Sequence, residues 1–367
     1  MSVGRYTAEP PFAHDAGEHT GIVLANLGTP DAPTAPALRR YLRQFLWDPR
    51  VVEIPRPLWW LILNAIILPL RPARSARRYA AIWMPEGSPL RVHTERQARL
   101  LETALAGAEL KGLIVDYAMR YGEPSIAAVL ERLRAAGCRR ILLVPMYPQY
   151  AASTTASTLD EAARALLAWR NVPEIRYVRG FHDHPAYIAA LAASVRAHWA
   201  EHGRGGRLVM SFHGIPRRSL DLGDPYHCEC RKTARLLGEA LGLAEQDYLV
   251  SFQSRFGRAQ WLQPYTQASL EGLARGGLAR ADVVCPGFVA DCLETIEEIG
   301  IECKAAFLGA GGREFHRIEC LNERPEWIEA LASIAIEHLG NWRDIEPPGA
   351  AELALRAGRA RALGARR

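Results

Sequence analysis

Lysine is scarce in this chain: Lys111, Lys232 and Lys304 are the only three among 367 residues, and arginine supplies almost all of the basic charge. An enzyme that forms a Schiff base with its substrate needs an amine that can lose its proton, and arginine stays protonated in proteins. A Schiff-base mechanism therefore has few candidates here.

Excess charge is also scarce outside the C-terminal end. The formal net charge is +5, and residues 350–367 carry +4 of it through five arginines and one glutamate. The remainder is close to neutral, so we expect no nucleic-acid partner. The Arg-rich tail, 346–367, is predicted to be flexible after the break at Pro347–Gly349, and either solvated or attracted to anionic lipid.

The sequence shows no signal for export. Its first 20 residues contain no apolar run of the signal-peptide kind, and its seven cysteines are an odd number without the density of a disulfide scaffold. We therefore expect a cytoplasmic protein, either free or attached peripherally to the inner face of the membrane.

Long apolar runs are missing as well. One charge-free apolar stretch, 57–70 (PLWWLILNAIILPL), has 14 residues and contains Pro69, whereas a membrane-spanning helix needs about 20 apolar residues. Two interpretations are open: a buried helix, or an apolar lip that dips into a membrane interface. The flanking arginines are Arg56, Arg71, Arg74, Arg77 and Arg78.

Short apolar runs alternate with helical patterns, which is typical of βαβ units with parallel sheets. The predicted strands are Gly21–Asn26, Gly112–Tyr117, Arg140–Pro145, Arg207–Phe212, Tyr248–Phe252 and Asp282–Cys285. The strand ends repeat in order, because LANLGTP resembles MSFHGIP, AMRYGEP resembles QSRFGRA, and VPMYPQY resembles VCPGFVA. We predict an α/β fold of two similar halves, 19–172 and 173–322, after an N-terminal tail, 1–18.

Polar residues follow the predicted strands, where open parallel sheets bind their ligands. They are Arg120, Tyr121, Tyr147, Gln149, His213, Gln253 and Arg255. This placement predicts a cleft between the halves. The chain has neither a G-x-G-x-x-G nor a Walker A motif, so nucleotide binding has no support.

Two features could carry chemistry. His213 follows an apolar run and precedes Gly214, so its ring can face a cleft as a base or metal ligand, although a structural histidine would show the same pattern. In an α-helix over 291–302, Asp291, Glu294, Glu298 and Glu302 would lie within about 80° of one face. Such a face is typical of a solvated helix, and it is also suited to pass a divalent cation along oxygen ligands.

Motifs of one enzyme family recur in order from about Gly21 to Trp342. The most specific is LVMSFHGIPRRSLDLGDPY, 208–226, which fits the family signature around an active-site histidine. Others are NLGTP (26–30), GSPL (87–90), RY (120–121), PQY (148–150), FQSR (252–255), WLQP (261–264) and the segment 291–298. The chain resembles the ferrochelatases, most closely the proteobacterial protoporphyrin type.

The resemblance implies two Rossmann-like halves of the chelatase type, with a helix at 323–345 that packs back on the first half. It implies a lyase that inserts Fe²⁺ into protoporphyrin IX, the final step of heme biosynthesis. His213 and Glu294 match the family's catalytic and metal-binding pair on opposite sides of the porphyrin. The acidic row Asp291, Glu298 and Glu302 is a candidate metal path.

The resemblance also implies which residues contact the porphyrin and which cofactors to expect. The porphyrin positions fall on Leu27, Tyr79, Arg120, Tyr121 and Trp261. Iron is then a substrate. Some relatives hold a 2Fe–2S cluster through a cysteine near the PQY motif or a cysteine-rich C-terminus. Here Ala151 and Ala152 occupy the first region and no cysteine follows Cys320, so we expect no cluster.

Other functions are open on the sequence. The nearest is a chelatase for coproporphyrin III or for cobalt, but the apolar stretch 57–70 favours the less charged protoporphyrin. A non-catalytic porphyrin or heme carrier would not need His213 as a proton acceptor. A solute-binding protein of similar shape would need a signal peptide.

Overall fold

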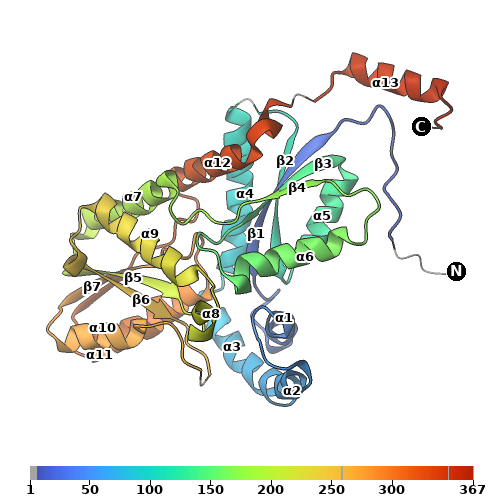
Figure 1. Ribbon diagram of the computed structural model, residues 1–367. Helices are drawn as coiled ribbons and strands as arrows, with labels where there is room; N and C mark the ends of the chain where they lie inside the picture. Colours follow the sequence, from blue (N-terminus) through green and yellow to red (C-terminus); the bar gives the residue numbers. More distant parts are fainter. Residues whose placement is uncertain (1–5, 109, 258, 346, 367) are drawn as a thin grey trace.

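Two separate parallel sheets form the centre of the protein (Figure 1). The computed structural model describes residues 6–366 apart from 109, 258 and 346. The first sheet has the order β2-β1-β3-β4 and the second β6-β5-β7-β8, so the two share one topology. Their strands are β1 (His19–Gly28), β2 (Leu113–Tyr121), β3 (Cys138–Pro145), β4 (Glu174–Tyr177), β5 (Arg207–His213), β6 (Tyr248–Gln253), β7 (Arg280–Val284) and β8 (Glu314–Arg317). The predicted α/β fold of two similar halves is confirmed.

The sequence repeats fall at equivalent places in the two sheets. Each pair of similar motifs lies at the ends of β1 and β5, of β2 and β6, or of β3 and β7. A proline carbonyl also accepts a strand N–H in both halves, from Met119 to Pro124 at 2.7 Å and from Phe252 to Pro264 at 2.8 Å. The similarity therefore extends to backbone hydrogen bonding.

The sequence pattern does not predict β4 and β8. Each is a four-residue edge strand that is largely or partly exposed, so neither contains an apolar run. Because β4 pairs with β3, the first sheet continues beyond the expected boundary at residue 172.

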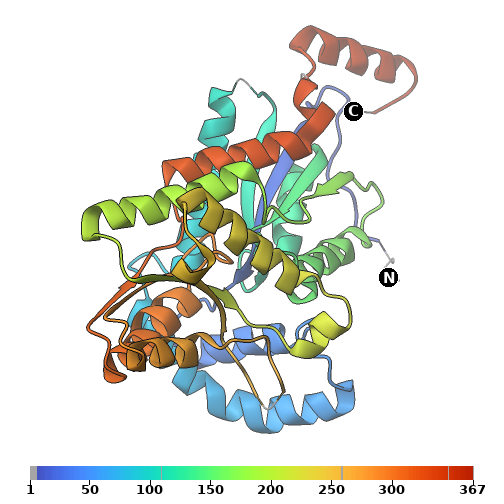
Figure 2. The ribbon, with the colours of Figure 1, turned by 60° about the vertical axis from the view of Figure 1, so that its left-hand side comes forward.

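The main hydrophobic core joins the two halves. Helix α12 (Pro325–Leu339) packs against α4 (Pro89–Gly107) and α7 (Pro185–His202), and it also contacts β3 and β4 of the first sheet (Figure 2). Trp327 of α12 is fully buried in the same cluster as Leu24 of β1 and Phe212 of β5. Shared burial thus fixes the relative position of the sheets. The other helices around the sheets are α5 (Ile126–Ala135), α6 (Ser157–Leu166), α8 (Arg217–Asp221), α9 (Tyr226–Leu241), α10 (Thr266–Arg275) and α11 (Lys304–Gly309), with short helical turns at Ala152–Ala156, Glu245–Asp247 and Gly340–Asp344.

The apolar stretch 57–70 forms part of a helical insertion after β1. This insertion contains α1 (Ala35–Trp47), α2 (Arg56–Ile62), the π-helical segment Leu63–Ile67 and α3 (Leu68–Ile82). Its inner side chains, Trp59, Leu63 and Leu68, are buried, whereas Leu58, Trp60, Leu61, Ile66 and Leu70 are 54–72% exposed. A wholly buried helix is therefore excluded. In the described part of the chain, no helix has the length and hydropathy needed to cross a membrane.

The two ends of the chain differ. The expected N-terminal tail lies along the first half where it is described, and Thr7 donates its N–H to the Ala168 carbonyl at 2.9 Å. At the other end, the prediction of a flexible tail is wrong for Ala350–Ala362, which form α13 and project from the body (Figure 1). Alanine, leucine and arginine dominate this segment, and their high helix propensity outweighs the preceding Pro-Gly break.

Candidate active site

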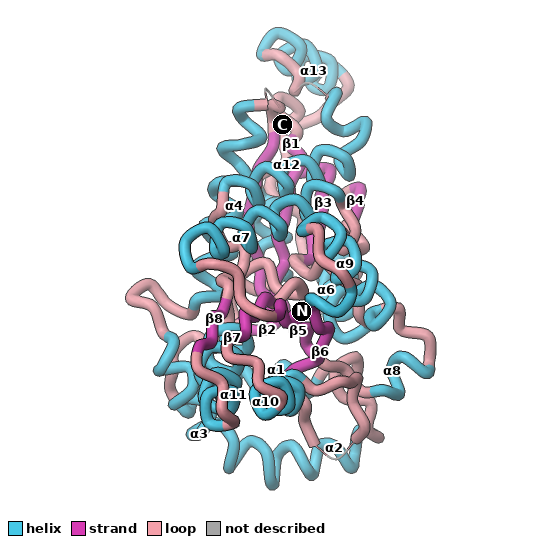
Figure 3. Tube along the Cα trace, turned by 90° about the vertical axis from the view of Figure 1, so that its left-hand side faces the viewer, coloured by secondary structure: helices cyan, strands magenta, loops and turns pink. Residues whose placement is uncertain are grey.

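A cleft of about 1150 Å³ separates the two halves. Its walls come from the ends of β1, β3, β5 and β6, and from α1, α3 and the segment after β7. Helices α1, α2, α3, α10 and α11 gather at this end of the molecule (Figure 3). Small-molecule pockets typically measure about 300–1,000 Å³, so this cleft has room for a large ligand. The cleft predicted from the strand ends is confirmed.

His213 lies at the carboxyl end of β5 and lines the cleft. Its Nδ1 is 2.6 Å from the Gly214 carbonyl oxygen. A carbonyl can only accept, so Nδ1 donates this hydrogen bond, and the tautomer that it selects has its lone pair on Nε2. A Cβ on Gly214 would come within 2.8 Å of the Gln253 carbonyl, so glycine is required for this close approach to β6.

Glu294 lines the cleft at the start of a π-helical segment, Glu294–Cys303, here called η4. The predicted α-helix over 291–302 is wrong in this respect. Side-chain spacing and propensity do not distinguish the two helix types, and π-helical turns often occur at functional sites. The Gln253 side-chain amide donates a hydrogen bond of 2.9 Å to the Glu294 carbonyl and so joins η4 to β6.

Glu298 lies beside this pair. It accepts hydrogen bonds from the Ser254 N–H at 2.7 Å and from the Ser254 hydroxyl at 2.5 Å. Burial raises the pKa of Glu298, the Ser254 bonds and His213 oppose the rise, and the charge of Glu294 adds to it. His213, Glu294 and Glu298 thus form one electrostatic cluster.

The outer end of the acidic row is paired across the cleft. Arg78 of α3 donates from Nε to Glu297 at 2.9 Å and also forms an ion pair with Glu302. Glu302 therefore lines the cleft with its charge compensated. This contact ties the helical insertion of the first half to η4 of the second.

Asp291 does not lie in the row. It is buried and absent from the described cleft lining. Its carboxylate accepts from Thr295 at 2.7 Å, from Arg317 at 2.6 Å and from Asn322 at 2.8 Å. Because these donors occupy both oxygens, Asp291 anchors η4 and is not free to pass a metal ion.

Three of the five expected porphyrin positions line the cleft: Leu27, Tyr79 and Trp261. Trp261 forms a β-bridge with Pro216, three residues after His213. Burial, and then the charge of Glu294, raise the pKa of Tyr79, so its hydroxyl stays protonated. These side chains give the cleft an apolar and aromatic wall beside the acidic row.

Arg120 and Tyr121 lie behind that wall instead, outside the described cleft lining. Arg120 forms a 2.6 Å ion pair with the buried Asp48, and the Tyr121 hydroxyl donates to the same carboxylate at 2.8 Å. The Phe45 ring covers Tyr121 at 5.2 Å between centroids and itself lines the cleft. Tyr121 is kept out of the cleft because α1 lies over it. The location of Tyr121 at a strand end does not by itself predict this.

Several residues that line the cleft were not predicted from the sequence. Tyr41 and Arg78 come from the helical insertion, and Ser254 adopts a left-handed conformation with φ of 64° to reach Glu298. Neither insertion residue was predicted to line the cleft, because helical periodicity does not show which strand ends a helix will cover. The FQSR motif did contain Ser254.

The chain matches known proteins over nearly its whole length. The ferrochelatase family model matches residues 19–339. The chain is 62% identical to the ferrochelatase of Aromatoleum aromaticum over 365 residues, covering 100% of both chains. It is 63% identical to that of Azoarcus sp. over 363 residues, covering 99% of each.

Among solved structures, SirB from Bacillus subtilis with Fe³⁺ has a TM-score of 0.50 at 15% identity, with coverage of 89% of this chain and 98% of that one. The sirohydrochlorin chelatase SirB from Bacillus subtilis subspecies spizizenii, in complex with cobalt, has a TM-score of 0.51 at 13% identity, with coverage of 88% and 96%. At these identities the likeness shows the chelatase fold alone.

Proposed function

The chain belongs to the ferrochelatase family, lyases that insert Fe²⁺ into a porphyrin for heme synthesis, and we propose that it acts on protoporphyrin IX between His213 and Glu294. The observation that supports this site most is that His213, whose Nδ1 is hydrogen-bonded to the Gly214 carbonyl, lines the same cleft as Glu294 and Glu298. Insertion requires two pyrrole N–H protons to leave while four nitrogens bind the metal. The site must therefore accept protons and stabilise a dication.

His213 and Glu294 divide these tasks by charge. A neutral imidazole accepts a proton near pH 7, whereas a protonated one would repel Fe²⁺. The carboxylate of Glu294 balances the charge of the incoming metal ion. Glu298 and Glu302 continue the carboxylates toward the rim, which supports a metal path that begins at the Arg78 ion pair.

The walls of the cleft supply the remaining requirement. A flat porphyrin directs its nitrogen lone pairs into a crowded plane, so the pocket must bend the ring to expose them. Leu27, Tyr79 and Trp261 offer contacts away from the metal that can sustain the bending.

The lip, residues 57–70, supports the choice of protoporphyrin and a peripheral contact with the cytoplasmic face of a membrane. Its exposed apolar side chains directly precede Arg71, which lines the cleft together with Phe256 of the opposite half. The Arg71 guanidinium stacks over the Phe256 ring at 4.5 Å. An apolar edge with nearby arginines suits an anionic membrane interface, from which a hydrophobic porphyrin can enter.

We also propose that the protein holds no iron–sulfur cluster and binds no nucleic acid. Burial raises the pKa of Cys138 and Cys303 to about 12, which disfavours the thiolate that a cluster requires. Cys228 is exposed while Cys230, on the same helix, is buried. Anaerobic purification followed by iron analysis tests the cluster; two irons per chain with charge-transfer absorption would overturn that part.

The porphyrin assignment is tested by anaerobic Fe²⁺ insertion, followed by absorbance, into protoporphyrin IX and coproporphyrin III in parallel. We expect faster insertion into protoporphyrin IX. A preference for coproporphyrin III, or for Co²⁺ over Fe²⁺, would reassign the substrate. Binding without insertion of either porphyrin would indicate a carrier.

A further inference from the structure

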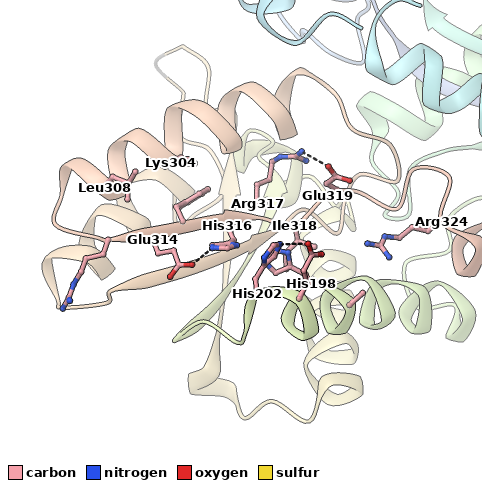
Figure 4. Close-up of a pocket in the computed structure, with 14 residues that line it drawn as sticks. His198, His202, Lys304, Leu308, Glu314, His316, Arg317, Ile318, Glu319 and Arg324 are labelled. Atoms are coloured by element: carbon pink, nitrogen blue, oxygen red, sulfur yellow. Dashed lines mark hydrogen bonds and ion pairs between the residues drawn. The ribbon is translucent and has the colours of Figure 1, made fainter. Parts of the chain in front are cut away.

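Three histidines gather outside the described cleft lining, on the second half. His198 and His202 lie one turn apart on α7, and His316 comes from β8 (Figure 4). One ring nitrogen of each lies within 4.8 Å of those of the other two. None of the three is among the described residues that line the cleft.

The rings contact one another without an evident hydrogen-bonding reason. Their centroids are 4.6 Å apart for His198 and His202, and 5.1 Å apart for each with His316. The Nε2 atom of His198 is buried and has no hydrogen-bond partner among the described residues. An orphaned buried nitrogen carries a cost, which a ligand at this position would remove.

Glu314 orients the third ring. The His316 Nε2 lies 2.6 Å from the Glu314 carboxylate, and a carboxylate can only accept, so Nε2 carries the proton. Nδ1 then holds the free lone pair. A carboxylate behind a ligating histidine is the usual outer partner in zinc sites.

We propose that His198, His202 and His316 bind one divalent transition-metal ion of the Zn²⁺ class. Three histidines with a fourth position open to water are a common zinc ligand set. The adjoining cavity, of about 700 Å³, is lined by Glu201 and Glu314 as well as by Lys304 and Arg313, and it gives solvent access to that position.

The geometry needs a modest closure. Ligands 2.0–2.1 Å from a tetrahedral ion lie about 3.3 Å apart, compared with the 4.8 Å limit in the empty cluster. Side-chain rotation of the exposed His202 supplies such a movement without displacing α7. The bound ion would join α7 to β8 and so brace the edge of the second sheet, independently of iron insertion.

Titration of the full-length protein with Co²⁺ alone, followed by visible absorption, tests the site. We expect one intensely absorbing tetrahedral Co²⁺ per chain, displaced by one equivalent of Zn²⁺, in the wild type and equally in His213→Ala. Retention in His213→Ala separates this site from the cleft, and thus from any failure of the proposed function.

Two variants from different elements, His202→Gln and His316→Gln, are each expected to weaken this Co²⁺ binding by at least about 10–100-fold. His338→Gln, on α12, is the matched control and should bind as the wild type does. Zn²⁺ should also raise the Tm of His213→Ala. In the His213→Ala background, the added control change His338→Gln should keep this rise, and the added ligand change His316→Gln should abolish it. Unchanged Co²⁺ binding in both ligand variants, or a wild type without the tetrahedral spectrum, would overturn the proposal.

Discussion

The Gln253 side-chain amide donates a 2.9 Å hydrogen bond to the backbone carbonyl of Glu294. The other end of the Gln253 amide accepts from the buried Ser211 hydroxyl at 2.6 Å. Because β6 carries Gln253 and the neighbouring β5 carries both Ser211 and His213, this side chain links the two sides of the proposed reaction site. Gln253 is therefore a positioning residue for Glu294.

Replacing Gln253 by Ala should lower kcat for iron insertion by about 10–100-fold, the usual effect of losing an outer partner of a metal site. The KM for porphyrin should change little, because the apolar walls remain. Gln246→Ala, an exposed glutamine on the turn before β6, is the control. A rise in KM with unchanged kcat would show that Gln253 holds the porphyrin instead.

The raised pKa of Glu298 predicts that this residue supports activity but lowers the stability of the folded protein at neutral pH. Burial is the main cause, so the folded protein binds this proton more readily than the unfolded chain does. The resulting stabilisation is present at low pH and is lost as the pH rises through the folded pKa. At pH 7, ionised Glu298 thus lowers the free energy of unfolding.

We expect Glu298→Gln to raise Tm at pH 7 by about 1–3 °C, with the gain disappearing near pH 4, while iron insertion slows. Calorimetry over pH 4–8 on wild type, Glu298→Gln and the exposed control Glu329→Gln checks this. A lower Tm in Glu298→Gln at pH 7 would contradict the account.

Asp48 predicts the opposite pH dependence. Burial tends to raise its pKa, but hydrogen bonds from Ser157, Arg50 and Tyr121 and the charge of Arg120 lower it overall. The stabilisation is then present above the unfolded pKa and lost as pH falls through the folded value. Asp48→Ala should reduce the free energy of unfolding at pH 7 by about 3–5 kcal/mol, and by less in acid, because it removes the buried partner of Arg120 and leaves only the more exposed Glu161 at 3.3 Å.

Asp31→Ala breaks an exposed pair with Arg40 and should cost only about 0–1 kcal/mol. Because Arg120 pairs with Asp48, we expect it to stabilise the fold and not to contact the porphyrin. Arg120→Ala should lose stability but bind protoporphyrin IX with wild-type affinity in the folded protein. A weaker porphyrin affinity with intact stability would restore Arg120 as a direct contact.

The lip predicts a difference between neighbouring tryptophans. Trp60 is 56% exposed, whereas Trp59 is buried and donates its indole N–H to the Leu46 carbonyl at 2.6 Å. Trp60→Ser should reduce flotation with anionic liposomes at unchanged Tm, and Trp59→Ser should lower Tm. Leu167→Ser removes a still more exposed apolar side chain outside the described cleft lining and should float as the wild type does. Equal flotation of Trp60→Ser and wild type would rule out the lip as the contact.

Burial explains how much of the fold was predictable. The inner strands β1 and β5 are nearly continuous buried runs, and their bounds were predicted within two residues. The edge strands β4 and β8 lack such a run. Likewise, the π-helical form of η4 depends on contacts such as Gln253 with Glu294, which join segments distant in the sequence.

The site was predictable where strand ends determine it. His213 and Gln253 face the cleft as parallel-sheet geometry requires. Tyr121 does not, because Phe45 of α1 covers it, and Arg120 does not, because it pairs with Asp48. Asp291 does not either, because it pairs with Arg317 of β8. His198 and His202 have the spacing of one helical turn in the sequence, but only the pairing of β8 with β7 brings His316 to them.

The most direct test of the account is anaerobic Fe²⁺ insertion into protoporphyrin IX by wild type, His213→Ala and the control His338→Ala, with porphyrin affinity measured separately by fluorescence. We predict that His213→Ala binds porphyrin with near wild-type affinity and forms no heme at a measurable rate, whereas the control is fully active. Heme formation by His213→Ala at the wild-type rate would contradict the central role of His213.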